Sequence, residues 1–183
     1  MLEQFQVAYH GTIDVYSEKI MDNIDINQSR YFTDFGRGFY VTSNESQARD
    51  WAMKKWQDNQ AQFPNCKPSV VGLSINTEGL KQYKGLVYSE PSDNWAEFVY
   101  NCRKEGRNDK LYHEYDFVCG ALADGKIVPL MNLMQRGKIN IEEFYRQIKP
   151  RSLENQLSFH TRLALEFIQN KEVHIIEEAN RVR

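Results

Sequence analysis

Two stretches decide the fold prediction, VAYHGT at residues 7–12 and DFGRGFYVT at residues 34–42. Each joins a run of apolar, aromatic or β-branched residues to glycine, which is typical of a strand that meets a turn. We therefore predict one strand over residues 5–13 and another over residues 39–42. The polar segment 25–38 between them is predicted to be a loop that closes on two glycines.

The rest of the chain alternates short strand patterns with helix patterns. Thr42 and Glu45 have the spacing of a capping box and predict a helix directly after the second strand, and Asn140 and Glu143 predict another that ends at Pro150. Because most strands are separated by irregular segments, the class is predicted to be α+β. Further helices are expected at 14–24 (or a turn there), around 95–102 and at 162–170, and further strands at 69–75, 84–90, 115–123, 155–161 and 172–178.

Composition limits the classes of protein that need considering. The 183 residues are 41% hydrophobic and 26% charged, which suits a single globular domain over residues 1–183. A net charge of −2 gives no support to nucleic-acid binding. No signal sequence or long apolar window is present, so we expect a cytoplasmic protein without a membrane partner.

The residues that commonly bind metals are poorly spaced for that purpose. Three cysteines stand far apart without a C-x-x-C pair, and Cys119 lies in an apolar run where an inert thiol is expected. His113, Glu114 and His160 show no ligand spacing either. The sequence therefore predicts no metal site.

The two opening motifs together resemble the ADP-ribosyltransferase superfamily, and within it the poly(ADP-ribose) polymerase-like H-Y-x branch. In that branch H-G-[ST] closes the first core strand, G-[KR]-G-[IF]-Y opens the second, and an aromatic residue follows eleven positions after the tyrosine, where this chain has Trp51. The resemblance looks closest to a bacterial domain-of-unknown-function group, on WAEFV (95–99), YDFVCGALAD (115–124) and QLSFHT (156–161). It implies an ADP-ribosyltransferase-like split mixed or antiparallel β-sheet with flanking helices.

The resemblance also implies NAD as substrate and a set of residues that bind it. The backbone of Gly11 would hold the nicotinamide carboxamide, and the Thr12 hydroxyl would add to that contact. His10 would hydrogen-bond the adenosine ribose, while Tyr40 would stack on the nicotinamide ring with Trp51 near its other side. We expect His10 and Tyr40 to lie on neighbouring strands and line one cleft, with Arg37 and Gly38 completing the NAD site.

The third position of the site departs from the family pattern. The family usually has a glutamate on a late strand, and Gln156 stands in its place here. Glutamine carries no charge and takes no proton, so a glutamate at this position is expected to raise NAD turnover. Glu154, on the same face of the predicted strand, is the alternative, followed by Asp116; Asp34 and Asp124 are expected to be turn or cap residues.

The leading functional prediction is an NAD-dependent mono-ADP-ribosyltransferase in which His10, Tyr40 and Gln156 are catalytic. Its ADP-ribose acceptor would be a protein, a nucleic acid or a small molecule. A bacterial toxin or defence effector with an antitoxin or immunity partner would be typical of the resemblance. An NAD glycohydrolase and a non-catalytic module that binds NAD or ADP-ribose remain as alternatives.

Overall fold

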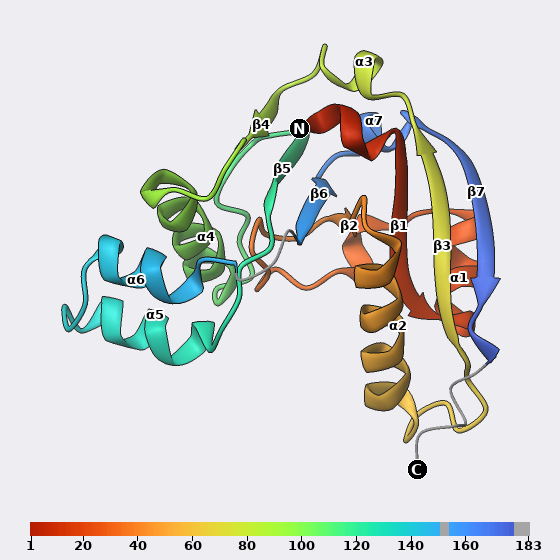
Figure 1. The fold of residues 1–183 in the computed structure, drawn as a ribbon, viewed down its shortest axis with the longest axis horizontal. Coiled ribbons are helices and arrows are strands. Elements are labelled where there is room, and N and C mark those ends of the chain that lie inside the picture. The colour runs from red at the N-terminus through yellow and green to blue at the C-terminus, as the bar shows by residue number, and fades with distance from the viewer. Residues whose placement is uncertain (151–153, 178–183) are drawn as a thin grey trace.

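The computed structural model describes residues 1–150 and 154–177 and confirms the α+β class (Figure 1). The strands are β1 (Val7–Ile13), β2 (Phe39–Val41), β3 (Pro68–Ile75), β4 (Gly85–Val87), β5 (Phe117–Ala121), β6 (Asn155–Phe159) and β7 (Ile168–Ile175). The α-helices are α1 (Asp14–Asp22), α2 (Glu45–Asn59), α3 (Thr77–Leu80), α4 (Asp93–Gly106), α5 (Ile127–Gln135), α6 (Ile141–Ile148) and α7 (Arg162–Leu165). Short 3-10 helices occupy Leu2–Gln6 and Ile26–Gln28.

The strands form two sheets. One is antiparallel and three-stranded, in the order β1-β3-β7; the other has four strands in the order β2-β6-β5-β4, with β4 parallel to β5. A single backbone bridge between Tyr9 and Thr42 joins the edge strand β1 to the edge strand β2. The two sheets are therefore coupled at one point and diverge beyond it.

Two hydrophobic clusters hold the sheets in place. The first fills the space between them with side chains from both, such as Ala8, Val71, Val41 and Leu157. The second lies on the other face of the four-stranded sheet, where α4, α5 and α6 gather away from β1 (Figure 1). Trp95 is fully buried in this second cluster.

Helix α2 lies directly on β1. Ala48 and Ala52 are buried on the face of α2 that meets β1, and their small side chains allow the helix backbone to approach the strand closely. At the contact point an added Cβ on Gly11 would lie 1.9 Å from the carbonyl oxygen of Ala48 and 2.8 Å from the nitrogen of Ala52. Only glycine leaves room for α2 there.

The observed elements correct three details of the sequence prediction. The side chain that caps α2 is that of Asn44, which accepts from Gln47 N, whereas Thr42 continues the bridge to β1. Helix α5 was not predicted, although Asn140 caps α6 as expected. The helix predicted over 162–170 ends at Leu165, because Ile168 already pairs with Ile75 in β3.

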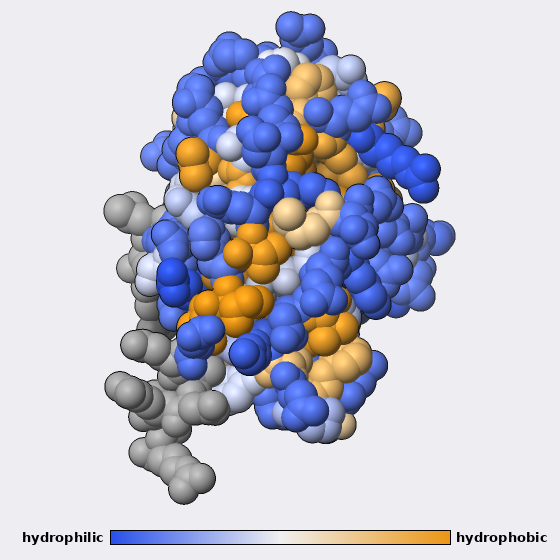
Figure 2. All heavy atoms as spheres, turned by 90° about the vertical axis from the view of Figure 1, so that its right-hand side faces the viewer, coloured by the Kyte–Doolittle hydropathy of each residue, from blue (hydrophilic) through white to orange (hydrophobic). Residues whose placement is uncertain are grey.

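The outer surface formed by α1 and β7 is mainly hydrophilic, with small separate apolar areas (Figure 2). Strand β7 is the edge of its sheet, and its Lys171, Glu172 and His174 place charged or titratable groups along that edge. Such groups discourage strand-to-strand association. Among the described residues, no helix combines the length and apolar character needed to cross a bilayer.

We expect Gly11→Ala to lower stability by about 3 kcal/mol, because the new methyl group meets the backbone of α2 rather than a movable side chain. Gly72→Ala, on the strand paired with β1, is the matched control, since the nearest atoms to its methyl group belong to the flexible side chain of Glu172 and not to backbone. Thermal unfolding should show a fall of roughly 6–12 °C for the first variant and little change for the second. Equal melting temperatures would contradict this packing.

Candidate functional site

Strand β1 presents unpaired backbone groups just beyond its bridge to β2. The N–H and C=O of Tyr9 bond those of Thr42, at 2.7 and 2.9 Å. Backbone groups alternate in direction along an antiparallel strand, so the N–H and C=O of Gly11 point the same way as those of Tyr9, away from β3. Asp14 N, which bonds Lys67 O on the β3 side, has the opposite parity and confirms the alternation.

The ring of His10 keeps β2 from pairing with Gly11. In a continued ladder the carbonyl of Tyr40 would accept from Gly11 N, but here it lies 2.6 Å from Nδ1 of His10. Since a carbonyl only accepts, Nδ1 carries the proton. The imidazole also stacks on Phe39, with ring centroids 4.8 Å apart. The gap at Gly11 is therefore built by a specific side-chain contact.

Burial holds the pKa of His10 below its usual value, and the positive charge of Lys55 lowers it further against the raising effect of the Tyr40 carbonyl. A neutral ring with its proton on Nδ1 leaves a lone pair on Nε2. Among the described residues, the fully buried side-chain nitrogens and oxygens without a partner belong to Thr77 and Trp95. Nε2 of His10 is not among these atoms, so its lone pair remains as a hydrogen-bond acceptor on a half-buried ring.

His10 and Tyr40 do lie on neighbouring strands, but their rings leave those strands on opposite faces. Tyr40 shares a face with Ser158 and packs there against the second cluster, on the α4 side, whereas His10 stacks on Phe39 in the face between the sheets. The two rings therefore do not line one face of a cleft. Trp51, on α2, is 39% exposed.

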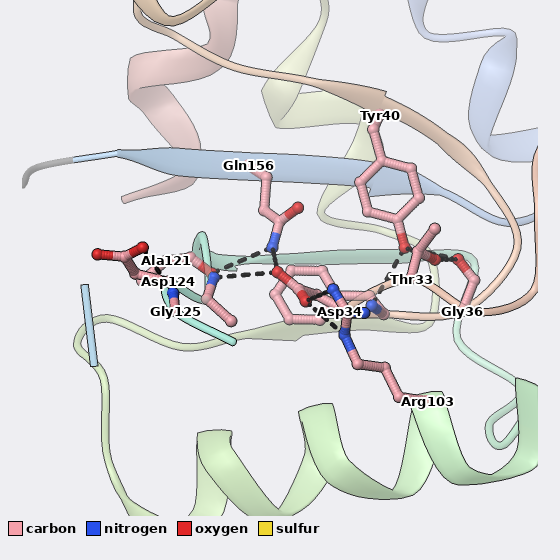
Figure 3. Close-up of polar contacts among 11 residues, drawn as sticks. Thr33, Asp34, Gly36, Tyr40, Arg103, Ala121, Asp124, Gly125 and Gln156 are labelled. Atoms are coloured by element: carbon pink, nitrogen blue, oxygen red, sulfur yellow. Dashed lines mark hydrogen bonds and ion pairs between the residues drawn. The ribbon is translucent and has the colours of Figure 1, made fainter. Parts of the chain in front are cut away.

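The Tyr40 hydroxyl is bonded to the loop that precedes β2. It donates to Gly36 O at 2.5 Å, lies 2.9 Å from the Thr33 hydroxyl and accepts from Phe35 N at 3.1 Å (Figure 3). Gly36 adopts a left-handed conformation with φ of 80° that favours glycine. The Tyr40 ring, which is predicted to stack on nicotinamide, is thus fixed in place by the hydrogen bonds of its hydroxyl group.

Two buried histidines, which sequence analysis had considered only as metal ligands, hold the same loop. Nε2 of His113 donates to Phe35 O and Nδ1 of His160 donates to Arg37 O, each at 2.8 Å. The His113 Nδ1 accepts from Tyr115 N, and the two rings meet edge to face at 4.6 Å. Each ring is turned to a backbone carbonyl, and the described residues contain no group of three side chains suited to a metal.

Gln156 lies at the centre of a second buried network. Its Nε2 donates to Asp34 Oδ2 at 2.9 Å and to Ala121 O at 3.2 Å (Figure 3). Asp34 is 3% exposed and also accepts from Arg103 Nη2 at 2.6 Å, Arg103 Nε at 2.9 Å and Ala123 N at 3.0 Å. Asp34 is therefore a buried anion in an ion pair, which corrects the expectation of a turn or cap residue.

The remaining predicted site residues divide into two groups. Gly38 packs so closely on β6 that a Cβ would lie 2.6 Å from Phe159 O, and the guanidinium of Arg37 lies over the ring of Tyr31 at 4.2 Å, so both belong to the loop. Thr12 is buried on the face opposite Gly11, and its hydroxyl makes no hydrogen bond within the described chain. Trp51 is 39% exposed on α2, and Nζ of Lys54 lies 4.9 Å from its ring centroid.

The alternatives to Gln156 occupy other positions. Asp116 accepts from the Thr161 hydroxyl at 2.8 Å and from Lys84 N at 3.1 Å, so it ties the ends of β4 and β6 together. The Glu154 side chain is partly exposed, and its carbonyl accepts from Leu122 N. Asp124 accepts from Gly125 N, as expected of a turn residue.

Comparison with known proteins assigns the chain to a protein family. The family model described as "Protein of unknown function (DUF3990)" matches residues 7–170. The chain therefore belongs to this family, and the match runs from the first residue of β1 into β7. No significant match was found among the curated proteins or the solved structures.

The buried histidines make stability depend on pH. Burial lowers the pKa of His113 and lowers that of His160 to about 3, so the unfolded chain binds protons that the folded chain does not. Their contribution is present above pH ~6.5 and is lost as the pH falls, and for His160 the loss is about 1.4 kcal/mol per pH unit down toward pH 3.

Denaturant unfolding between pH 7.5 and 5 should therefore show a shallower loss of stability in His160→Gln than in the natural chain. His174→Gln is the matched control, since that side chain is 52% exposed. A pH profile of His160→Gln that parallels the natural one would contradict the assignment.

We expect Gln156→Glu to destabilise the protein at neutral pH by about 1–3 kcal/mol, because a carboxylate replaces a donor that faces the Asp34 carboxylate and Ala121 O. Burial beside Asp34 should raise the pKa of the new carboxyl, so the loss should grow as the pH rises above about 4.3. Denaturant unfolding of this variant and of the natural chain, at pH 4 and at pH 7.5, measures this loss of stability. A variant as stable as the natural chain at pH 7.5 would refute the geometry; Glu154→Gln is the control.

Proposed function

We propose that this protein is an NAD-dependent mono-ADP-ribosyltransferase. The observation that carries the proposal is the gap at Gly11, where β1 offers an N–H and a C=O that neither β2 nor β3 takes. This donor and acceptor pair complements the carboxamide of nicotinamide, whose C=O accepts and whose NH₂ donates. The carboxamide would thus take the place of the next pair of backbone groups in the interrupted ladder.

Two aromatic side chains support a flat ring at this place. Tyr40 is the residue of β2 that would face Gly11 in a continued ladder. The indole of Trp51 on α2 is 39% exposed and can cover a nicotinamide ring in place of Lys54, whose Nζ lies 4.9 Å from the ring centroid. Offset stacking of this kind contributes about 0.5–1.5 kcal/mol. Tyr40 is held by the Gly36 carbonyl and so forms a fixed wall.

His10 supplies a polar contact for the sugar part of the ligand. Its neutral ring presents Nε2 as an acceptor, which suits a ribose hydroxyl. Lys55 contributes positive charge near this ring, as its effect on the pKa of His10 shows. An anionic dinucleotide would benefit from that charge.

The proposed reaction cleaves the bond between C1′ of the ribose and the nitrogen of nicotinamide. The bonding electron pair leaves with nicotinamide, and positive charge develops on the sugar in an oxocarbenium-like state. An acceptor nucleophile then forms the new bond to C1′ and releases its proton. Because residue 156 offers an amide and no carboxylate, single transfer suits the site better than chain elongation.

The acceptor would be a protein, a nucleic acid or a small molecule. A bacterial toxin or defence effector, acting in the cytoplasm and restrained by an antitoxin or immunity partner, is the setting that we propose for such a transferase. A second candidate is a module that binds NAD or ADP-ribose without cleaving it. Residue 156 is an amide, and the neighbouring carboxylate of Asp34 already accepts four hydrogen bonds, which favours this candidate.

Incubation of the protein with labelled NAD and a cell lysate separates these functions. Label on macromolecules together with released nicotinamide is the result that we expect. Free ADP-ribose with nicotinamide would indicate an NAD glycohydrolase, and binding without nicotinamide release would indicate the non-catalytic module. No binding of NAD or ADP-ribose, in calorimetry on the same preparation, would refute the proposal.

We expect Trp51→Ala to weaken the binding of both NAD and free nicotinamide by roughly 2- to 13-fold, because the stacking contact of the ring is lost. The side chain is 39% exposed, so the melting temperature should hardly change. Leu163 is also apolar and exposed but lies on α7. The variant Leu163→Ala is therefore the control that should leave both affinities unchanged. Unaltered affinity for nicotinamide in Trp51→Ala would show that Trp51 does not stack on the ligand.

A further inference from the structure

The amide of Gln156 has a fixed orientation. Both contacts of its Nε2, Asp34 Oδ2 at 2.9 Å and Ala121 O at 3.2 Å, are to oxygens that only accept. Turning the amide over would place Oε1 against two acceptors. The carbonyl oxygen Oε1 is therefore the end directed away from Asp34 (Figure 3).

Gln156 is 5% exposed, and Oε1 is the polar end of its amide that the network leaves without a partner among the described residues. This oxygen makes no hydrogen bond within the described residues, and it does not belong to the buried, unpartnered atoms found there, which are those of Thr77 and Trp95. Gln156 precedes Ser158 by two positions on β6, and Ser158 pairs with Tyr40, so the amide leaves the strand on the same face as the Tyr40 ring. On that face Asp34 joins the amide to Arg103 of α4.

We infer that Asp34 is a positioning residue that turns the acceptor end of Gln156 toward a ribose hydroxyl of the ligand. The inference rests on the proposed function. It explains how Gln156 can serve at the position where ADP-ribosyltransferases usually have a glutamate. Arg103 fixes the Asp34 carboxylate through two nitrogens, and Asp34 in turn occupies the donor end of the amide. Only an acceptor then remains for the sugar, as it would with a carboxylate.

The orientation of the amide also follows from energies. An unsatisfied buried donor or acceptor costs about 1–3 kcal/mol, and inverting Gln156 would leave two acceptors facing an oxygen. Thermal energy is about 0.6 kcal/mol at 25 °C, so the inverted amide is a minor state. Removal of the carboxylate at residue 34 weakens this preference and lets the amide turn.

The test compares NAD with an NAD analogue that lacks the 2′-hydroxyl of the nicotinamide ribose. The natural chain should bind NAD roughly 2- to 13-fold more tightly than the analogue, as expected for one net hydrogen bond of about 0.5–1.5 kcal/mol. Asp34→Asn and Gln156→Leu should each abolish the preference, and the double variant should add nothing further. Asp116→Asn, the same change at another aspartate that bonds backbone and hydroxyl groups, should keep it.

A second readout does not depend on ligand. In NMR spectra the side-chain amide protons of Gln156 should be protected from solvent exchange in the natural chain and in Asp116→Asn, and should lose that protection in folded Asp34→Asn. Asp34→Asn that keeps both the protection and the preference for NAD, with only a lower melting temperature, would reduce Asp34 to a structural role and overturn the inference.

The failure of the inference is distinct from failure of the proposed function. If the natural chain binds NAD and the analogue equally, the positioning role is refuted while NAD binding stands. If it binds neither compound, the proposed function fails and the inference with it.

Discussion

The hydrogen bond from Nδ1 of His10 to the carbonyl of Tyr40 is the contact on which the site depends. At 2.6 Å it satisfies an oxygen that would otherwise pair with Gly11 N, and so it ends the ladder between β1 and β2 after one bridge. Without it the two sheets could close into a continuous surface. The contact is local, but it determines that the backbone of Gly11 faces a gap.

The loop 33–38 is the second part of the site and is held more firmly than most loops. Tyr40, His113 and His160 bond its backbone, while Asp34 anchors it to α4 and β6. A buried ion pair such as Asp34–Arg103 adds little net stability, but loss of one partner is costly because the other is left charged. We infer that this network serves orientation more than stability, at the cost of sensitivity to acid.

The sequence predicts the strands and most helices because their apolar periodicity is regular, as in α4 and β3. It also singles out His10 and Gly11, which lie where the ladder between β1 and β2 is interrupted. Asp34, His113 and His160 could not be recognised as loop anchors, because their partners are backbone carbonyls and side chains far away in the chain; Gln156 and Asp34 are 122 positions apart. The face on which Tyr40 lies follows from the bridge of Tyr9 to Thr42, which no local pattern encodes.

Hydrogen exchange at single backbone amides tests the central claim most directly. In the free protein the N–H of Gly11 should exchange roughly tenfold or more faster than those of His10 and Thr12, which bond β3. Saturating nicotinamide should slow exchange at Gly11, whereas nicotinic acid, which lacks the amide NH₂ and carries a negative charge, should slow it less. Equal protection of the three amides in the free protein, or exchange at Gly11 that nicotinamide leaves unchanged, would contradict the account.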